Sequence, residues 1–462
     1  MYVFLPIVLI IYFLSNAKVK NWVLLVSGLI FYAWGEPKYI MIMIISSFVD
    51  YFAGLIMYKY DKNPKIRKLA LITSMVVDLG FLVVFKYSGF FIDNFNEIFG
   101  TSLKNPDLPL PIGISFYTFQ SMSYTIDMYW RQIKVQKNFV NFLSYVSLFP
   151  QLVAGPIVRY EDVQNEIEKR SVNINLAGEG VTIFIKGLTK KVLLANNIGS
   201  LWTSVKAMDY STMSAVTAWL GILAFTFQVY FDFSGYSDMA IGLGKMLGFN
   251  FPKNFDHPYT SKSIAEFWRR WHITLGSWFR TYIYIPLGGN RKGKLRTLFN
   301  TMVVWATTGF WHGASWNFIF WGAYFGVLII IERLGFGKIL SEKLNPAIST
   351  AYTFILVVIG WVFFDIDGMG NAFSYIKAMF GGGGSFIDSY AKYQFGSYFI
   401  MFIFCIIAST EYPSRFIENL KKNPKTAKAQ TFLSPVVQAV LMLVSTAYLV
   451  DATYNPFLYF RF

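Results

Sequence analysis

The sequence has few charged residues and a single cysteine, and each shortage excludes a class of protein. Of its 462 residues, 15% are charged and 55% are hydrophobic, whereas soluble domains carry about 25% charged residues. The mean hydropathy of +0.43 therefore argues against a string of soluble domains. Cys405 is the one cysteine, so an intramolecular disulfide and a Cys-x-x-Cys metal site are both excluded. Because Cys405 lies in an apolar run, we expect it to face lipid or fill the core.

Several catalytic signatures are also missing. The sequence contains no GxSxG, HExxH, Walker or GxGxxG pattern, which argues against a nucleophile-elbow hydrolase, a zinc protease, a P-loop NTPase and a dinucleotide-binding enzyme. The net charge of +15 is a weak sign of nucleic-acid binding. In so apolar a chain, basic cytoplasmic loops that face anionic lipid explain this charge better.

Long apolar runs recur along the whole chain. They lie at 2–14, 21–35, 39–57, 69–91, 109–129, 139–157, 179–204, 212–232, 299–332, 348–365, 396–411 and 432–452. A spanning helix needs about 20 such residues, so we expect about 10–12 membrane segments in an all-α bundle. The first run follows no basic stretch and precedes no small-residue cleavage site. We therefore read it as a retained, short membrane helix rather than a signal peptide.

The basic residues predict an orientation. Lys and Arg gather at 18–20, 59–68, 131–137 and 415–428, while the loop at 92–108 carries acidic residues as well. Because cationic loops stay in the cytoplasm, both ends of the chain are expected outside it. The chain is then one membrane domain, with N-terminal helices at 1–108, a core at 109–333, C-terminal helices at 334–452 and an extracytoplasmic tail at 453–462.

The run 299–332 is too long for one span. At 1.5 Å per residue it would form a helix of about 51 Å, against a hydrocarbon core of about 30 Å. We therefore expect a hairpin or a re-entrant pair. His312 lies inside this run, between Gly309 and Gly313, whose spacing lets another helix or a ligand approach closely. An ionisable residue at membrane depth is a functional candidate, although a hydrogen-bonded structural histidine is the alternative.

A second histidine lies in the least lipid-like long segment, 234–298. Ser263 and Glu266 form a capping-box pattern, which predicts a helix that begins at Ile264. Spacings of three and four residues then put His272 on its aromatic face, with Trp268, Trp271 and Trp278. Its arginines, Arg269, Arg270 and Arg280, can face lipid headgroups or an anionic ligand, and Glu266 can pair with Arg270. An interfacial amphipathic helix explains most of these residues but not the histidine. The third histidine, His257, lies in a loop and is expected to be structural.

Four aspartates lie in or beside apolar runs: Asp50, Asp78, Asp232 and Asp238. They can relay protons, orient a histidine or bind the backbone of a broken helix, and we favour the structural roles. A neutral imidazole can take a proton from a hydroxyl that attacks an activated acyl group. The residues alone therefore leave two functions open: acyl transfer from a thioester, and proton-coupled transport.

Several long motifs, in order, carry a resemblance to a known family. They are LPIGISFYTFQSMSYTIDMYW ending at Trp130, LFPQLVAGPIVRY (148–160), DFSGYSDMAIGLGKMLGF (232–249), the segment 258–291 with WRRWH, and the Trp-His-Gly of 311–313. The sequence resembles the membrane-bound O-acyltransferases, most closely the subgroup of alginate and peptidoglycan O-acetylation proteins. One departure is Thr281, where many relatives carry an acidic residue.

The resemblance implies a helical bundle around a central tunnel, in a multi-pass protein of a bacterial cytoplasmic membrane. It implies a cytoplasmic thioester donor, acetyl-CoA, as substrate, with no bound cofactor or metal. His312 would be the principal catalytic residue and His272 the second. Residues expected to bind the donor or line the tunnel are Trp311, Trp268, Arg269, Arg270, Arg280, Asn254, Asp232 and Asp238. The partners would be a polysaccharide acceptor and an extracytoplasmic SGNH-type acetyltransferase. D-alanyl transfer to teichoic acid is the alternative within the family.

The C-terminal residues 457–462 read FLYFRF. Their aromatic side chains can simply anchor the tail at the membrane interface. They also resemble an FxYxxF motif of bacterial envelope acylation proteins, which implies that Tyr459 accepts the acyl group and passes it to the partner. A phenol has a pKa of about 10, so an aryl ester would stay activated for a second transfer, and Tyr459 would supply the nucleophile that the bundle lacks.

Overall fold

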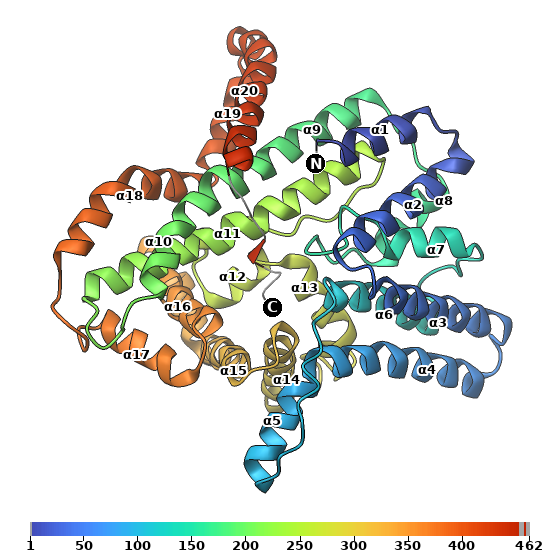
Figure 1. The fold of residues 1–462 in the computed structure, drawn as a ribbon, viewed down its shortest axis with the longest axis horizontal. Helices are drawn as coiled ribbons and strands as arrows, with labels where there is room; N and C mark the ends of the chain where they lie inside the picture. The colour runs from blue at the N-terminus through green and yellow to red at the C-terminus, as the bar shows by residue number, and fades with distance from the viewer. Residues whose placement is uncertain (1, 452–456, 459–462) are drawn as a thin grey trace. The chain divides into compact units, whose positions relative to one another are not determined.

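The computed structural model describes residues 2–451, 457 and 458 (Figure 1), except for the side chains of residues 424 and 425. Every regular element within this part of the chain is a helix, which confirms the all-α prediction. Contacts divide the chain into two units. The first comprises Met1–Val181 and Ala240–Pro252, and the second comprises Thr182–Met239 and Lys253–Phe462.

The first unit holds the N-terminal helices. They are α1 (Phe4–Leu14), α2 (Ala17–Gly35), α3 (Ile40–Lys59), α4 (Pro64–Leu82), α5 (Ser88–Phe99), α6 (Ile114–Trp130), α7 (Phe139–Val146), α8 (Tyr160–Glu168) and the start of α9 (Ile174–Thr189). Asparagine caps begin three of them: the side chains of Asn16, Asn63 and Asn138 accept backbone N–H groups that would otherwise lack partners. These caps explain why α2, α4 and α7 start where they do.

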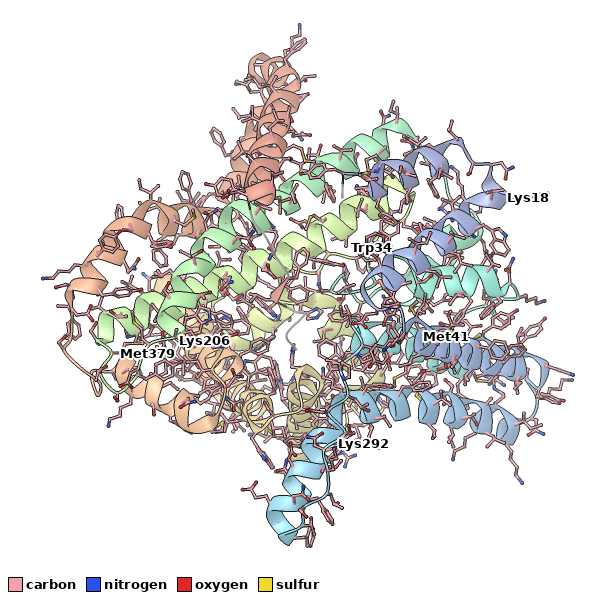
Figure 2. All side chains as sticks on the ribbon, viewed as in Figure 1. Lys18, Trp34, Met41, Lys206, Lys292 and Met379 are labelled. Atoms are coloured by element: carbon pink, nitrogen blue, oxygen red, sulfur yellow. The ribbon has the colours of Figure 1, made fainter. Side chains whose placement is uncertain are left out.

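The second unit holds both predicted catalytic histidines. Its helices are α10 (Asn196–Lys206), most of α11 (Ala215–Met246), α12 (Ile264–Arg270), α13 (Ile273–Phe279), α14 (Lys294–His312), α15 (Trp316–Ile331), α16 (Pro346–Asp365), α17 (Met369–Met379), α18 (Ser389–Ala408), α19 (Tyr412–Lys422) and α20 (Pro424–Asp451). A π-helical turn, Lys190–Ala195, joins α9 to α10. Figure 2 labels Lys206 at the end of α10, where its ammonium lies 2.9 Å from the Asp365 carboxylate.

Seven helices among the described residues are long and apolar enough to cross a membrane. They are Ile40–Lys59, Pro64–Phe99, Ala215–Met246, Trp316–Phe336, Pro346–Asp365, Ser389–Ala408 and Thr426–Asp451. The chain is therefore a multi-pass membrane protein, as predicted. The other predicted segments are not among these seven, and loops interrupt some of them. The run 139–157, for example, gives the eight-residue α7 followed by an irregular stretch.

The run 299–332 forms a hairpin, as its length predicted. Helix α14 ends at His312, residues 313–315 are non-helical, and α15 begins at Trp316. The two helices touch at Gly309 and Gly322. A β-carbon on Gly309 would lie 2.3 Å from the Phe318 carbonyl oxygen, so only glycine allows this approach. Gly313 belongs to the break, with extended backbone, and not to the same helical face.

In the first unit, Asp50 and Asp78 join three helices. The hydroxyl of Ser74 donates to Asp50 at 2.6 Å, and the hydroxyls of Ser46 and Ser121 donate to Asp78. Both carboxyl groups are buried. They therefore hold α3, α4 and α6 together, which agrees with the structural role favoured from the sequence.

Candidate active site

The helix predicted from Ile264 begins there but ends sooner than expected. The Ser263 hydroxyl accepts the Glu266 N–H at 3.0 Å, which confirms the cap. Helix α12 then stops at Arg270, and His272 has left-handed backbone angles of φ 45° and ψ 54° before α13 begins. The prediction of one continuous aromatic helix through Trp278 was therefore wrong. Non-glycine residues rarely adopt this backbone conformation, and such residues often mark functional sites.

The break is stabilised from outside the helix. The backbone of the 254–256 loop binds both sides of it: Ile273 N–H donates to the Asn254 carbonyl at 2.9 Å, and Asp256 N–H donates to the Arg270 carbonyl at 2.9 Å. These bonds satisfy backbone groups that a continuous helix would have paired internally. The loop thus sets the direction of His272.

Asn254 fixes which nitrogen of His272 carries the proton. The Asn254 Oδ1 atom accepts the Thr274 N–H at 3.3 Å and the Thr274 hydroxyl at 2.9 Å, and His272 Nδ1 lies 3.1 Å from the same oxygen. Since the backbone N–H can only donate, this atom is the amide oxygen, and His272 Nδ1 must donate to it. The other ring nitrogen, Nε2, then carries a lone pair and can accept a proton.

His272 is neutral in this setting. Its side chain is 2% exposed, and burial lowers the pKa of His272 to about 3, because a low-dielectric environment disfavours the charged imidazolium. A neutral imidazole with a fixed tautomer presents one nitrogen that donates a hydrogen bond and one that accepts.

His312 is the last residue of α14 and is also buried, at 4% exposure. Aromatic rings surround it, with centroids 5.0 Å away for Trp321, 5.3 Å for Phe364 and 6.4 Å for Phe318. It therefore lies in a buried, aromatic environment at the end of a helix that stops inside the unit.

Trp311 connects the two histidines. Its ring centroid lies 6.3 Å from that of His272 and 5.0 Å from that of His312. The histidines are 40 residues apart in the sequence, yet both contact this one indole. The structure thus brings together three of the predicted site residues.

Trp268 lies on α12 and belongs to the same aromatic cluster. Its ring is 5.3 Å from that of Trp321, which in turn contacts His312. A carboxylate binds the N-terminus of α12: Glu332 accepts the N–H groups of Ile264 at 2.7 Å and Ala265 at 2.9 Å. A negative charge at a helix N-terminus is favourable, so Glu332 positions the helix that leads to His272.

Of the three arginines predicted to bind a ligand, one lies beside acidic side chains and two are exposed. Arg270 pairs with Glu266 at 2.6 Å, as the four-residue spacing predicted, and lies 3.8 Å from Glu411. Arg269 and Arg280 are exposed. None of the arginine contacts recorded among the described residues involves a histidine, so their role as ligand-binding groups stays a prediction.

Asp232 and Asp238 each pair with a lysine that the sequence analysis missed. Lys191 forms an ion pair with Asp232, and both side chains are buried; Lys190 lies 2.8 Å from Asp238. The two lysines follow each other in the apolar run 179–204, and the two aspartates lie six residues apart on α11. Two lysines inside one apolar run, and two carboxylates at and just beyond the end of the next, were a signal available from the sequence.

Asn254 and Asp238 also line a polar cavity of about 490 Å³. Its ionisable lining residues come from α9, the π-helical turn after it, α11, the 253–257 loop, and α19 with its N-cap. They are Lys186, Lys190, Asp238, Lys253, Asp256, His257, Glu411, Arg415 and Glu418. The cavity therefore reaches the side chain that holds His272. His257 contacts Asp256 at 3.3 Å at its edge. A larger apolar groove, of about 1020 Å³, lies between α1 and α2 and is lined by none of the predicted site residues.

Among the described residues, no group of three His, Cys, Asp or Glu side chains is close enough to hold a metal ion. Tyr459 lies outside the described residues, so its predicted role as an acyl acceptor stays a prediction. Cys405 is fully buried in the aromatic cluster of the second unit.

Comparison with known proteins identifies the family. Residues 29–364 match the model of the membrane-bound O-acyltransferase family. The chain belongs to this family. It is 37% identical to a probable alginate O-acetylase of Pseudomonas putida, over 100% of this chain and 98% of the relative. It is 34% identical to a peptidoglycan O-acetyltransferase of Helicobacter pylori, over 82% and 78% of the two chains. A teichoic acid D-alanyltransferase of Streptococcus thermophilus is 29% identical, over 55% and 68%.

Membership confirms the resemblance read from the motifs. The matched region contains His272, Trp311 and His312, and thus the whole pair of histidines with the indole between them. The protein is therefore a multi-pass O-acyltransferase.

Proposed function

We propose that the protein takes an acetyl group from a cytoplasmic thioester, acetyl-CoA, and moves it across a bacterial cytoplasmic membrane for O-acetylation of an envelope polysaccharide. The observation that carries this proposal is the pair of buried histidines in contact with Trp311. The relatives support the acceptor class, since two of them act on polysaccharides by name.

Acetyl is favoured over D-alanyl as the acyl group. The alginate and peptidoglycan acetylation relatives match at 37% and 34% over most of the chain, whereas the D-alanyltransferases match at 29% and 25% over about half of it. Proton-coupled transport loses its support, because Asp50 and Asp78 bind serine hydroxyls, and Asp232 and Asp238 are paired with lysines.

The donor would approach through the polar cavity beside Asn254. Four cations and four carboxylates line this cavity. Lys253 and Arg415 pair with Asp256 and Glu411, and these cations would have to exchange partners to bind the phosphates of a coenzyme A thioester. Arg415 belongs to the basic stretch predicted to face the cytoplasm. A donor bound there would lie beside Asn254, whose amide oxygen contacts His272.

The chemistry needs a nucleophile, and we assign it to Tyr459. The phenolic oxygen attacks the thioester carbonyl, His312 takes the phenolic proton, and the carbon–sulfur bond breaks. The imidazolium returns the proton to the leaving thiolate, which departs as a thiol. The tyrosyl ester then passes its acyl group to a hydroxyl of an extracytoplasmic SGNH-type transferase, and from there to the polymer. His272 supports the donor end of the site.

The first test concerns His312. His312→Ala should lower polymer acetylation by about 10²–10⁴-fold, the usual contribution of a general base. Acetylation is compared with the wild type at equal amounts of protein in the membrane. Near-normal acetylation would contradict the assignment. Thiol release from acetyl-CoA by the purified protein tests the donor separately.

A second test concerns Tyr459. Tyr459→Phe keeps the ring and removes the hydroxyl, so it should abolish polymer acetylation while the amount of protein is unchanged. Full activity in this variant would leave only membrane anchoring for the residue.

A further inference from the structure

The last described residues of the chain return to the helices of the second unit. The Leu458 N–H donates to Asp232 Oδ2 at 2.9 Å. The Phe457 ring centroid lies 4.8 Å from Lys191 Nζ, and the ring meets that of Tyr236 edge-on at 4.6 Å. Three separate contacts therefore hold two consecutive residues of the tail, all from the π-helical turn after α9 and from α11.

The ion pair behind these contacts has the features of a binding site. Lys191 and Asp232 have side-chain exposures of 7% and 3%, and buried charges are retained only where they are paired and hydrogen-bonded. Lys191 binds Oδ1 of the carboxylate, while Oδ2 accepts the tail N–H. One oxygen of the carboxylate thus binds Lys191 and the other binds the backbone of the tail, a contact that does not depend on the tail's side chains.

The tail contacts adjoin the histidine site. Phe233, the residue after Asp232 on α11, packs against the His272 ring at 4.7 Å. Leu458 packs against the buried cluster that includes Phe233, Trp321 and Phe364. The helix that binds the tail therefore also supplies a wall of the His272 environment, and the residue after Leu458 in the sequence is Tyr459.

We propose that Lys191, Asp232 and Tyr236 form a docking site for the C-terminal segment of the chain, and that this site positions Tyr459 for acylation. The proposal rests on the proposed acyl relay. The three side chains are positioning residues. Docking has to be reversible for the relay to work, and the Lys191–Asp232 pair does not depend on the tail for its own contact. The acylated tail can then leave to meet the extracytoplasmic transferase.

Cross-linking tests whether the tail occupies this site in the full-length protein. In a Cys405→Ala background, Tyr236→Cys and Phe457→Cys should be joined rapidly by dibromobimane, which fluoresces after it links two neighbouring thiols. The control pair is Tyr236→Cys with Phe386→Cys. Phe386 binds Val216 through its backbone, about 30 Å along α11 from residue 236. Equal cross-linking of the two pairs would overturn the docking site.

A matched pair of tail variants tests the hydrogen bond without altering the helices. Leu458→Pro removes both the side chain and the N–H donor, whereas Leu458→Ala removes only most of the side chain. The proline variant should cross-link at least about ten times more slowly than the alanine variant, and should acetylate polymer at least about ten times more slowly in the chain that keeps Phe457. Equal cross-linking of the two variants refutes docking through Asp232. Slower cross-linking with unchanged acetylation refutes the positioning role.

Tyr459→Phe separates this proposal from the relay on which it rests. In that variant the cross-link should still form while acetylation is lost. A cross-link that forms together with normal acetylation would refute the relay and leave the tail as a docked structural segment. Loss of the cross-link in Tyr459→Phe would mean that the tyrosine hydroxyl, rather than Asp232, holds the tail.

Discussion

Asn254 gives the sharpest prediction, because one atom of its side chain controls the tautomer of His272. Asn254→Ala removes the acceptor of the His272 Nδ1–H and leaves a buried donor without that partner. An unsatisfied buried donor costs about 1–3 kcal/mol. The same energy favours the tautomer that leaves a lone pair on Nε2. Since about 1.4 kcal/mol is a tenfold change in rate, acyl transfer should fall by about 5-fold to 150-fold.

Two neighbouring variants serve as controls for this effect. Thr274→Val removes the hydroxyl that donates to Asn254 but leaves the contact between Asn254 and His272. Ser237→Ala removes the acceptor of the Asn254 amide N–H at 3.0 Å. Because both variants keep the amide oxygen of Asn254 as the partner of His272 Nδ1, each should lower the rate by less than about 3-fold.

The assay is release of free thiol from acetyl-CoA by the purified protein, with polymer acetylation in cells at equal membrane amounts as the second measurement. If Asn254→Ala works at the wild-type rate, or if Thr274→Val is as damaging as Asn254→Ala, then the amide does not control His272.

Three further predictions concern stability, measured by thermal unfolding in detergent. The pKa of His272 is about 3 in the folded protein and near 6.5 when unfolded, so the unfolded chain binds more protons between these values. The free energy of unfolding should therefore fall by up to about 1.4 kcal/mol per pH unit as the pH drops below 6.5. His272→Gln should flatten that slope. A slope unchanged in His272→Gln would mean that this histidine is not buried in its neutral form. Gly309→Ala should destabilise the protein by about 1–3 kcal/mol through the close approach to α15, unlike Gly370→Ala, where a β-carbon meets no atom within 4 Å. Glu332→Gln should destabilise it by about 0.5–2 kcal/mol, because the first N–H groups of α12 lose a charged acceptor; no loss would show that the charge is unimportant there.

Features encoded locally could be predicted from the sequence. The cap at Ser263 and the pairing of Glu266 with Arg270 depend on residues within one helical turn of each other, and both are present. The hairpin within 299–332 followed from helix length alone. Such features need no knowledge of the remaining chain.

Features that depend on distant segments could not be predicted. Helix α12 ends at Arg270 because the 254–256 loop supplies hydrogen-bond partners on both sides of His272, and no local residue signals this break. Lys191 and Asp232 are 41 residues apart on separate elements, so their pairing depends on how these elements pack. The histidines could be identified as candidates from the sequence. Only the fold shows that both of them contact Trp311.

The end of α14 at His312 has a consequence for how material crosses the membrane. A transporter exposes its site first to one side and then to the other, by moving one group of helices against another. Here α14 ends at a buried histidine, and in the proposed reaction the imidazole keeps this position while the donor and the acceptor come to it. Only a two-carbon group would then change sides, by a change of bond rather than of conformation. The bilayer would stay sealed to ions and to coenzyme A throughout the catalytic cycle.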